Sequence, residues 1–295
     1  MAAGNKVRAL EFLLGRVREG DTVVTLGGEG STHVLATAIH AARLGARTVA
    51  FRWRHDMHDA ARLVRQRGGE RCALAATVPG GVVLALPIAR AWALTGRAHW
   101  VPIGGSDPLG TLGHVNAGLE LAEQVAAGAM PEPSRIVVPL GSGGTAAGIA
   151  LGAAIAGLRT IVTAVRVAPR IGTNRWRTLG LARRTARLIE RHTGAHLPDP
   201  SPHLLVEHGH YGGAYGRPLA RGATAAATLR EAGGPVLEPT YGEKAFAAAL
   251  DVLQLPGGAR GGDGPVLFWA TFDARLLEPI AVDAAPPPQG TPHDR

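Results

Sequence analysis

The sequence predicts an α/β protein of two domains, each a mostly parallel sheet flanked by helices. Apolar, β-branched runs alternate with alanine-rich amphipathic segments along most of the chain, which is the pattern of strand–helix units. The 295 residues suffice for one large domain or two modest ones. Residues 104–110, which read Gly-Gly-Ser-Asp-Pro-Leu-Gly, are typical of a crossing between domains.

In the first half, strands are expected where short β-branched runs are bounded by turn residues: 22–26, 47–53, a short one near Cys72, and 99–103. Helices are expected where the apolar period changes to that of a helix: 32–44, 56–66 and 82–95.

The second half repeats this theme. Its expected strands are 136–140, 160–167, 204–207 and a buried one at 266–270. Its expected helices are 114–127, 145–156, an arginine-bearing one over 175–191, 219–232 and 241–253. Residues 284–295 are proline-rich and are expected to be a disordered tail.

Composition restricts the class of protein. The formal charge is +8 and the pI about 10.8, yet the arginines are scattered rather than gathered with aromatics, so no nucleic-acid partner is expected. The positive field favours small anionic substrates. No apolar run has membrane-spanning length and the first residues do not form a signal peptide, so no membrane partner is expected. The single cysteine, Cys72, excludes an internal disulfide, and we expect a cytoplasmic protein.

Lysine is rare in this chain: Lys and Arg together number 31, but only Lys6 and Lys244 are lysines. An arginine cannot replace a lysine where a neutral amine must attack a carbonyl, because a guanidinium stays protonated. Lys6 is therefore a candidate nucleophile. The alternative is a surface lysine that escaped replacement.

Two glycine turns follow predicted strands. In Gly141-Ser142-Gly143-Gly144-Thr145 the glycines let backbone N–H groups converge at a helix N-terminus, which suits a phosphate. The turn at residues 27–33 ends in Ser31-Thr32-His33 and suits a smaller anion, such as a substrate carboxylate. The alternative for each is a tight turn with a capping hydroxyl.

All three tyrosines lie beside glycines in two predicted loops: Tyr211 and Tyr215 in one, Tyr241 in the other. Such tyrosines are available to stack on a flat ring or to move protons. A candidate amine nucleophile, a phosphate loop, a carboxylate turn and loop aromatics together indicate an aldehyde cofactor that carries a phosphate. That cofactor is pyridoxal 5'-phosphate, which serves amino-acid chemistry as an electron sink.

Six motifs then occur in one order and carry a resemblance. They are Gly4-Asn5-Lys6 with the apolar residues after it, Gly30-Ser31-Thr32-His33, Pro102-Ile103-Gly104-Gly105-Ser106, the loop at 141–148, Tyr215-Gly216, and Glu238-Pro239-Thr240-Tyr241. From Gly4 to Thr271 the chain resembles the D-cysteine desulfhydrase and 1-aminocyclopropane-1-carboxylate deaminase family. That family belongs to the tryptophan synthase β-like, fold type II pyridoxal phosphate enzymes.

The resemblance implies a role for each matching residue. Lys6 would hold the cofactor as a Schiff base and shuttle the α-proton, and Ser31, Tyr215 and Tyr241 would join it as catalytic residues. The phosphate would lie on Ser142, Gly143, Gly144 and Thr145, with Asn5 close by. Ser31, Thr32 and His33 would face the substrate carboxylate and the 3′-oxygen of the ring. Thr271 would lie near the pyridine nitrogen, and Lys244 would be structural.

It also implies an organisation. Residues 12–113 would form the small domain, and residues 1–11 with 114–283 the large cofactor-binding domain, without the amino-terminal segment that relatives carry before their lysine. A homodimer fits the family. Four departures stand out: Ala9 replaces a lysine, Thr32 an asparagine, Gly242 a glutamate of some deaminases, and Phe272-Asp273 a glycine pair.

The hypothesis that follows is a pyridoxal phosphate-dependent lyase or deaminase. Its expected substrate is a small amino acid, D-cysteine or another β-substituted one, which gives a keto acid and ammonia. One alternative is a catalytically impaired homologue that binds cofactor or amino acid without turnover. Another is a phosphate- or nucleotide-binding regulator that uses the loop at 141–148 and the basic surface.

Overall fold

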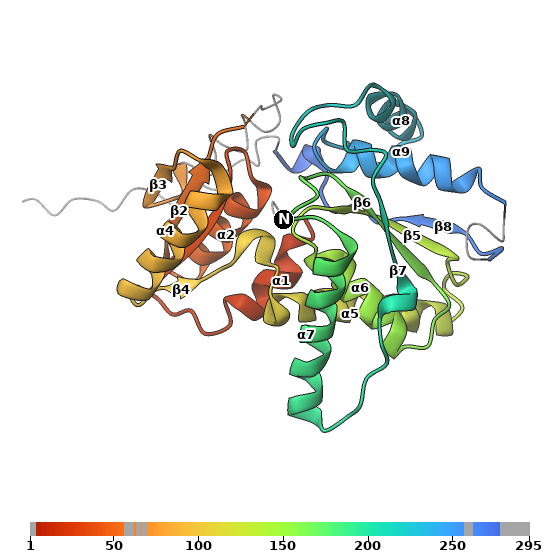
Figure 1. Cartoon of the computed structure of the whole chain (residues 1–295), viewed down its shortest axis with the longest axis horizontal. Helices are drawn as coiled ribbons and strands as arrows, with labels where there is room; N and C mark the ends of the chain where they lie inside the picture. The colour runs from red at the N-terminus through yellow and green to blue at the C-terminus, as the bar shows by residue number, and fades with distance from the viewer. Residues whose placement is uncertain (1–3, 56–61, 63–65, 67–69, 257–261, 278–295) are drawn as a thin grey trace, which may run out of the picture.

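The computed structural model describes residues 4–55, 62, 66, 70–256 and 262–277, which form two lobes (Figure 1). The first lobe has a four-stranded parallel sheet of order β3-β2-β1-β4. Its strands are β1 (Thr22–Gly28), β2 (Arg47–Trp53), β3 (Leu74–Thr77) and β4 (His99–Trp100). Its helices are α2 (Thr32–Arg43) and α4 (Gly81–Thr95).

Alternate residues of β1 face opposite sides of this sheet, as the two-residue period of a strand requires. Val24 and Leu26 pack with Phe51 against alanines of α4. Val23 packs on the other side, in a cluster with Leu10 and Leu14 and alanines of α2. Because both faces are covered, six of the seven residues of the strand are buried.

The second lobe has a parallel sheet of order β7-β6-β5-β8. Its strands are β5 (Arg135–Leu140), β6 (Ile161–Arg166), β7 (Leu204–Glu207) and β8 (Val266–Phe268). Its helices are α5 (Pro108–Ala126), α6 (Gly144–Ile155), α7 (Arg175–Thr193), α8 (Ala220–Glu231) and α9 (Gly242–Leu253). Short 3-10 turns lie at Ile103–Gly105, Ser201–His203 and Ala274–Leu277.

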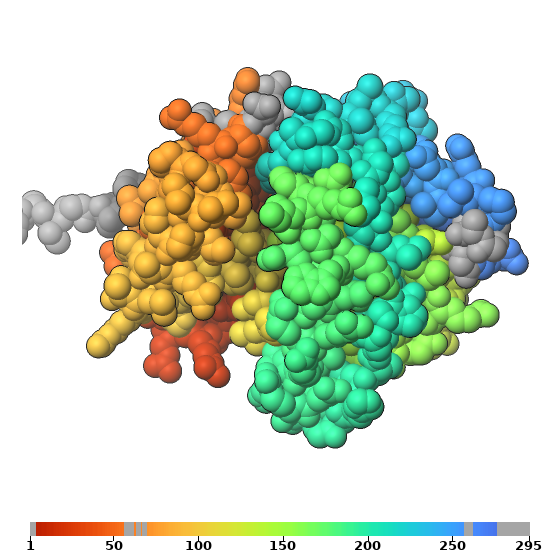
Figure 2. All heavy atoms as spheres, viewed as in Figure 1, coloured from red at the N-terminus to blue at the C-terminus, as the bar shows by residue number. Residues whose placement is uncertain are grey.

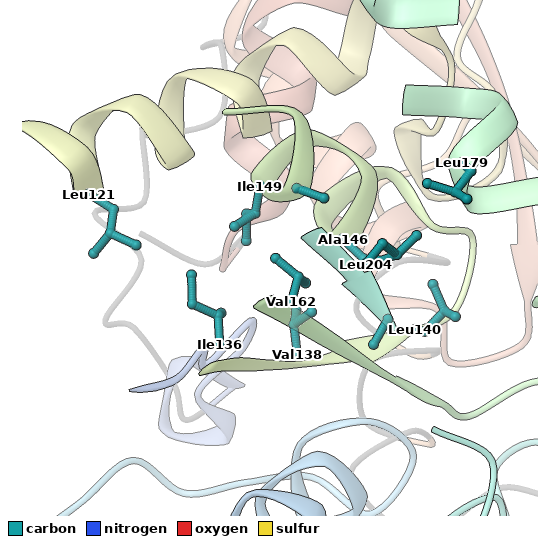
Figure 3. Close-up of a cluster of buried hydrophobic side chains, with 11 residues drawn as sticks. Leu121, Ile136, Val138, Leu140, Ala146, Ile149, Val162, Leu179 and Leu204 are labelled. Carbon is teal, nitrogen blue, oxygen red and sulfur yellow. The ribbon is translucent and has the colours of Figure 1, made fainter. Parts of the chain in front are cut away.

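Each face of this sheet is covered by helices. Ile136, Val138 and Leu140 pack with residues of α5, α6 and α7, as Figure 3 shows. Val137 and Val165 face the other side, where α9 covers them. The lobes meet along a seam between the orange and yellow surface and the green and cyan surface (Figure 2).

Helix α1 (Lys6–Leu13) connects the two lobes. Leu10 belongs to the core of the first lobe, whereas Arg8 forms an ion pair with Glu120 of α5, at 2.6 Å. The approach of α1 to α5 is close, because a Cβ atom on Gly113 would lie 1.8 Å from the backbone oxygen of Arg8. Gly113 therefore lets α1, and with it Lys6, lie directly on the second lobe.

Most expected elements are present, and four differ. Helix α5 begins at Pro108, inside the expected crossing, because Asp107 caps it by accepting from Gly110 N at 2.8 Å and proline suits a first turn. Strand β3 begins after Cys72, at Leu74, and β4 ends at Trp100, where the chain turns into the 3-10 segment. Strand β8 is half-buried instead of buried.

The half-burial of β8 has a geometric cause. It is the edge strand of its sheet and pairs with β5 alone among the described strands. A shallow cavity of about 250 Å³ opens beside it, lined by Leu121, Met130, Leu267 and Trp269 among others.

The expected domain boundaries, 11/12 and 113/114, fall inside α1 and α5, so each of these helices would belong to both domains. The division into two domains stays a prediction. The expected helix at 56–66 and the expected tail at 284–295 lie largely or wholly outside the described residues. Within the described part of the chain, no helix combines the length and the apolar character needed to cross a membrane.

Candidate active site

Lys6 begins α1 at the seam between the lobes. The residue before it, Asn5, donates from its side-chain Nδ2 to Thr145 Oγ1 at 2.9 Å, and from its backbone N to the carbonyl of Thr271 at 2.9 Å. Thr145 follows β5 and Thr271 follows β8, so both come from the same edge of the parallel sheet. Asn5 is the N-cap residue of α1 but makes no side-chain cap. Its side chain bonds instead to the glycine loop and ties Lys6 to it.

Burial shifts the ionisation of the groups around Lys6. Desolvation lowers the pKa of Lys6 to about 8, because a poorly hydrated site disfavours the charged amine. Desolvation, and then the charge of Lys6, lower the pKa of His33 and of His114 to about 3 each. Both imidazoles are therefore neutral near pH 7. The site therefore holds one amine, that of Lys6, which can lose its proton near neutral pH. The two imidazoles stay neutral and do not take up a proton in its place.

The glycine loop forms an anion cradle at the start of α6. Gly143 has φ 98, a conformation that favours glycine, and turns the chain into the helix. Ser106 accepts from Gly144 N at 3.0 Å and donates to Ser142 Oγ at 2.7 Å. The first amides of a helix lack partners within it and carry the positive end of its dipole. This cradle therefore suits a phosphate.

The residues around Lys6 fit a polar ligand. Among the described residues, Asn5 Oδ1 and His114 Nδ1 are buried polar atoms without a hydrogen-bond partner. Such atoms are uncommon in native proteins and call for an explanation. Together with the cradle and a nucleophilic amine, they match a phosphorylated aldehyde ring.

The second glycine turn also ends at a helix N-terminus. Ser31 caps α2, its Oγ accepting from Val34 N at 3.4 Å, and Thr32 begins the helix. His33 is buried and its Nε2 lies 2.9 Å from Thr25 Oγ1 of β1. The structure therefore leaves Ser31 and Thr32 half-exposed at the helix end and directs His33 toward β1. Their carboxylate-binding roles stay predictions.

Tyr215 and Tyr241 form a pair. Their hydroxyl oxygens lie 2.7 Å apart, and a Cβ atom on Gly141 would lie 3.0 Å from Tyr241 Cε1, so Tyr241 packs on the phosphate loop. Burial raises the pKa of Tyr215 to about 12 and that of Tyr241 well above its usual value. Both hydroxyls are therefore protonated near pH 7. Tyr211 lies apart, with the Arg166 guanidinium 4.0 Å from its ring centre.

Two residues of the site carried no assigned role in the sequence. Ser106 bonds to the glycine loop at 141–145, although it was expected only as part of a crossing between domains and of one of the six family-like motifs. His55 packs edge-on against Tyr215, with ring centres 4.8 Å apart, and a Cβ atom on Gly28 would lie 2.7 Å from its ring. His55 thus connects the second glycine turn to the tyrosine pair. Its position just after a predicted strand was the available signal.

Ala9, one of the four departures from the resembled family, is closely packed. Its side chain is 1% exposed, and a Cβ atom added to Gly105 would lie 3.0 Å from the Cβ of Ala9. A small residue therefore allows the 3-10 turn before Ser106 to approach α1.

Gly104 tests the cradle. A Cβ atom there would lie 2.0 Å from Ser142 Oγ, at a φ of 65 that L side chains rarely adopt. We expect Gly104→Ala to weaken cofactor binding by about 10-fold to 10²-fold, equivalent to about 1–3 kcal/mol of strain. The measurement is a titration of apoprotein with pyridoxal phosphate, followed by absorbance.

Gly233→Ala is the matched control for this experiment. Gly233 also has a positive φ, 78, but an added Cβ meets nothing within 4 Å. It carries the backbone strain without the clash at Ser142. Equal cofactor affinities of the two variants would contradict the assignment of this glycine loop as the phosphate cradle of the cofactor.

Comparison with known proteins shows the family of this chain. The family model described as pyridoxal-phosphate dependent enzyme matches residues 2–271. Nocardicin C-9' epimerase of Nocardia uniformis subsp. tsuyamanensis is 39% identical over 282 residues, which cover 92% of this chain and 82% of the relative. D-cysteine desulfhydrase of Klebsiella pneumoniae (strain 342) is 32% identical over 287 residues, covering 93% and 83%.

Solved structures of related enzymes have a similar fold. A crystal structure of an ACC deaminase homologue has a TM-score of 0.72 and 26% identity, covering 93% of this chain and 83% of the other. A crystal structure of a threonine deaminase, at 19% identity and a TM-score of 0.61, shares the fold and covers 90% and 82%. The fold and site define a pyridoxal phosphate-binding α/β enzyme. The chain belongs to the pyridoxal-phosphate dependent enzyme family, and its cofactor is pyridoxal 5'-phosphate.

Proposed function

We propose that this enzyme removes the α-proton of a small amino acid and eliminates its β-substituent, giving a keto acid and ammonia. D-cysteine or another β-substituted amino acid is the proposed substrate. The observation that carries the proposal is the contact of Asn5 with Thr145, which joins a desolvated Lys6 to a phosphate cradle. The 32% identity to a D-cysteine desulfhydrase supports the substrate class.

When bound, the cofactor supplies an electron sink for the pair left by the broken Cα–H bond. Lys6 Nζ accepts the α-proton, because its lowered pKa leaves a useful fraction of neutral amine near neutral pH. Asn5, Thr145 and the first amides of α6 orient the ring through its phosphate. These groups bind and position, and Lys6 transfers the proton.

Ser31 and Thr32 bind the substrate carboxylate at the N-terminus of α2, where the helix dipole favours an anion. The Tyr215–Tyr241 pair supplies a proton to the departing β-substituent, because burial keeps both phenols protonated. The β-carbon–substituent bond breaks with its electron pair on the leaving group. Hydrolysis of the remaining fragment then gives the keto acid and ammonia.

We propose a homodimer as the assembly, to be checked by the mass of the protein in solution.

A second candidate is epimerisation, which the 39% identity to nocardicin C-9' epimerase favours. Lys6 would still remove the α-proton, and a tyrosine hydroxyl of the pair would return one to Cα. No β-substituent would leave.

One experiment tests the proposed function and separates both candidates. The holoenzyme is incubated in deuterium oxide with D-cysteine, L-cysteine and β-chloroalanine. We then measure deuterium at Cα, inversion at Cα, and keto acid with ammonia. Elimination gives keto acid, and epimerisation gives an inverted, deuterated amino acid without keto acid. A loaded enzyme that produces neither contradicts both and fits the impaired homologue.

The tyrosine pair yields a prediction of its own. We expect Tyr215→Phe to lower kcat about 10²-fold, because it removes one hydroxyl of the proton-donating pair while keeping the ring. Tyr211→Phe is the matched control, since its ring stacks on Arg166 and its carbonyl accepts from Lys244. It should retain activity within about two-fold of wild type. Equal losses in the two variants would contradict the role of the pair.

A further inference from the structure

We propose that Lys244 is a positioning residue that sets where the Tyr215 hydroxyl lies. From α9 its ammonium holds the main chain of the tyrosine loop, which we define as residues 208–216. The inference rests on the proposed function only in taking Tyr215 and Tyr241 as residues of the active site.

Lys244 is fully buried, with 0% exposure, and is the largest such side chain in the described part of the protein. Its Nζ donates to the carbonyl of Tyr211 at 2.9 Å. A buried ammonium is costly unless it is bound or paired. Burial lowers its pKa to about 8, while the carboxylates of Glu238 and Glu243 raise it and Arg166 lowers it.

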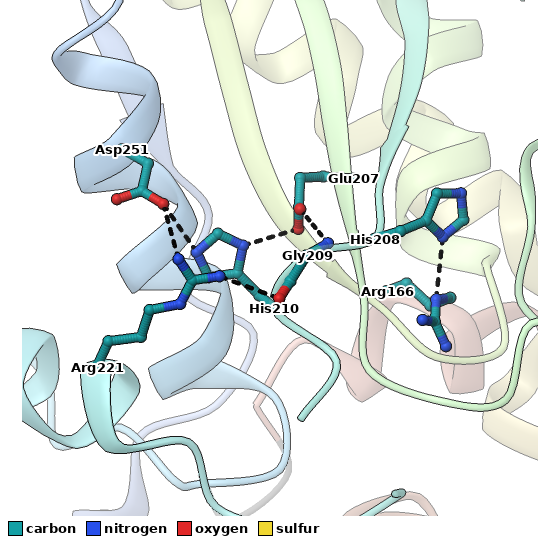
Figure 4. A network of polar contacts seen from close by, with 7 residues as sticks. All are labelled: Arg166, Glu207, His208, Gly209, His210, Arg221 and Asp251. Atoms are coloured by element: carbon teal, nitrogen blue, oxygen red, sulfur yellow. Dashed lines mark hydrogen bonds and ion pairs between the residues drawn. The ribbon is translucent and has the colours of Figure 1, made fainter. Parts of the chain in front are cut away.

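The upstream half of the tyrosine loop is anchored to its surroundings, as Figure 4 shows. His210 lies between Glu207, at 2.9 Å, and Asp251 of α9, at 3.1 Å. Arg221 of α8 donates to the carbonyl of Gly209 at 3.0 Å. The residues just before Tyr211 are therefore held in place.

Tyr211 is the last of these anchors. Lys244 binds its carbonyl, and the Arg166 guanidinium lies over its ring. Arg166 is itself held, since it donates to His208 Nδ1 and to the carbonyl of Ala168, each at 3.0 Å. Lys244 thus fixes the main chain at this point and Arg166 fixes the side chain.

Downstream of Tyr211 the chain turns through Gly212 and Gly213, whose φ values are 75 and 86. Both lie in the region that favours glycine, so this turn has little side-chain support. Tyr215 follows two residues later and meets Tyr241. Its place in the active site is set by its own contacts with Tyr241 and His55 and, in this proposal, by where the Tyr211 carbonyl is held.

Helix α9 carries both ends of this arrangement. Tyr241 is its N-cap residue and Lys244 lies in its first turn. Glu238 fixes that end of the helix, since its carboxylate accepts from the backbone N of Tyr241 at 2.7 Å. One helix therefore places Tyr241 directly and Tyr215 through Lys244, which sets the 2.7 Å between their hydroxyls.

The choice of lysine is consistent with this role in a chain that otherwise uses arginine. A Cβ atom on Gly212 would lie 3.7 Å from Lys244 Nζ, so the loop closes over the ammonium. A guanidinium is planar and larger, and its five donors need more acceptors than an ammonium does.

The chain offers a direct readout, because all three of its tyrosines lie in this region. Ionisation of tyrosine, followed by the ultraviolet absorbance of phenolate in the apoprotein, reports the site without any assay of turnover. In Lys244→Met we expect Tyr215 to gain solvent and to ionise about one pH unit or more below its wild-type value. In the holoenzyme, kcat should fall about 10²-fold while cofactor affinity stays unchanged.

Two controls sharpen the test. Lys244→Met combined with Tyr215→Phe should lack the early-ionising group, which assigns it to Tyr215. Arg230→Met removes an exposed cation from α8 and should titrate like wild type.

A tyrosine titration of Lys244→Met identical to that of wild type would overturn the proposal, whatever happens to the rate. If this variant does not fold, Lys244→Gln is measured instead, with the same expected direction and the same overturning result. Because the titration uses apoprotein, its outcome is independent of whether the enzyme eliminates, epimerises or does neither.

Discussion

Lys6→Ala is expected to abolish the visible absorbance of lysine-bound cofactor and to lower turnover about 10³-fold or more. The chain has one other lysine, and Lys244 is fully buried and bound to the Tyr211 carbonyl, so it cannot substitute. Reduction of wild-type holoenzyme with borohydride, followed by peptide mass spectrometry, should label the peptide that contains Lys6. Label on Lys244 would refute the assignment.

Lys6→Arg is the matched control for charge. It keeps a cation at the start of α1 but offers no neutral amine, so we expect the same loss as in Lys6→Ala. Activity retained in Lys6→Arg would mean that the positive charge, and not the amine, is what the site uses.

The lowered pKa of Lys6 also predicts a pH dependence. In apoprotein, acylation of this amine by trinitrobenzenesulfonate should rise with pH around a midpoint of about 8. Between about 8 and the ordinary value of 10.5 the unfolded chain binds more protons than the folded one at this residue. The contribution of Lys6 to the free energy of unfolding therefore rises with pH across that window. A midpoint near 10.5 would show that the amine is not desolvated.

Gly113→Ala is the second substitution with a large expected effect. The added Cβ would lie 1.8 Å from the backbone oxygen of Arg8, so α1 must move away from α5. We expect the free energy of unfolding to fall by about 2–4 kcal/mol, because neither helix backbone can yield as a side chain would. Lys6 lies two residues before Arg8, so cofactor binding should weaken too. Denaturant unfolding and cofactor titration measure the two effects.

Gly180→Ala in α7 is the matched control. Gly180 is also a helical glycine, but its added Cβ would meet only the end of the Arg184 side chain, at 3.4 Å. Alanine should stabilise that helix by about 0.5–1 kcal/mol. If Gly113→Ala were neutral or stabilising as well, the close contact of α1 with α5 would be disproved.

Much of the fold could be predicted from local patterns. Strand β1 and helix α9 lie within two residues of their expected bounds, because β-branched runs, apolar periods and glycine turns act between neighbours in the chain. Helix α5 was expected six residues too late, since the capping signal of Asp107 and Pro108 was interpreted as a crossing. The expectation that β8 is fully buried was wrong, because an apolar run does not reveal that a strand lies at the edge of its sheet.

The candidate site divides in the same way. The sequence revealed the candidate residues themselves, because they are of suitable types in suitable turns: Lys6, the loop at 141–145 and the two loops with tyrosines. It did not reveal their contacts, which are the hydrogen bonds of Asn5 with Thr145 and of Ser106 with Ser142, and the packing of His55 on Tyr215. Each joins residues that are far apart in the chain, and no local pattern encodes which surfaces will meet.

By itself, the sequence determined the α/β class, the resemblance to pyridoxal phosphate enzymes and the candidate amine nucleophile. These follow from periodicity, turn residues and the rarity of lysine, all of which are local or compositional. Only the tertiary structure decided that α1 lies on α5 through Gly113, that the half-buried Lys6 has a lowered pKa, and that Lys244 donates to the Tyr211 carbonyl. Desolvation and close packing depend on all the atoms around a group, and those atoms come from distant parts of the chain.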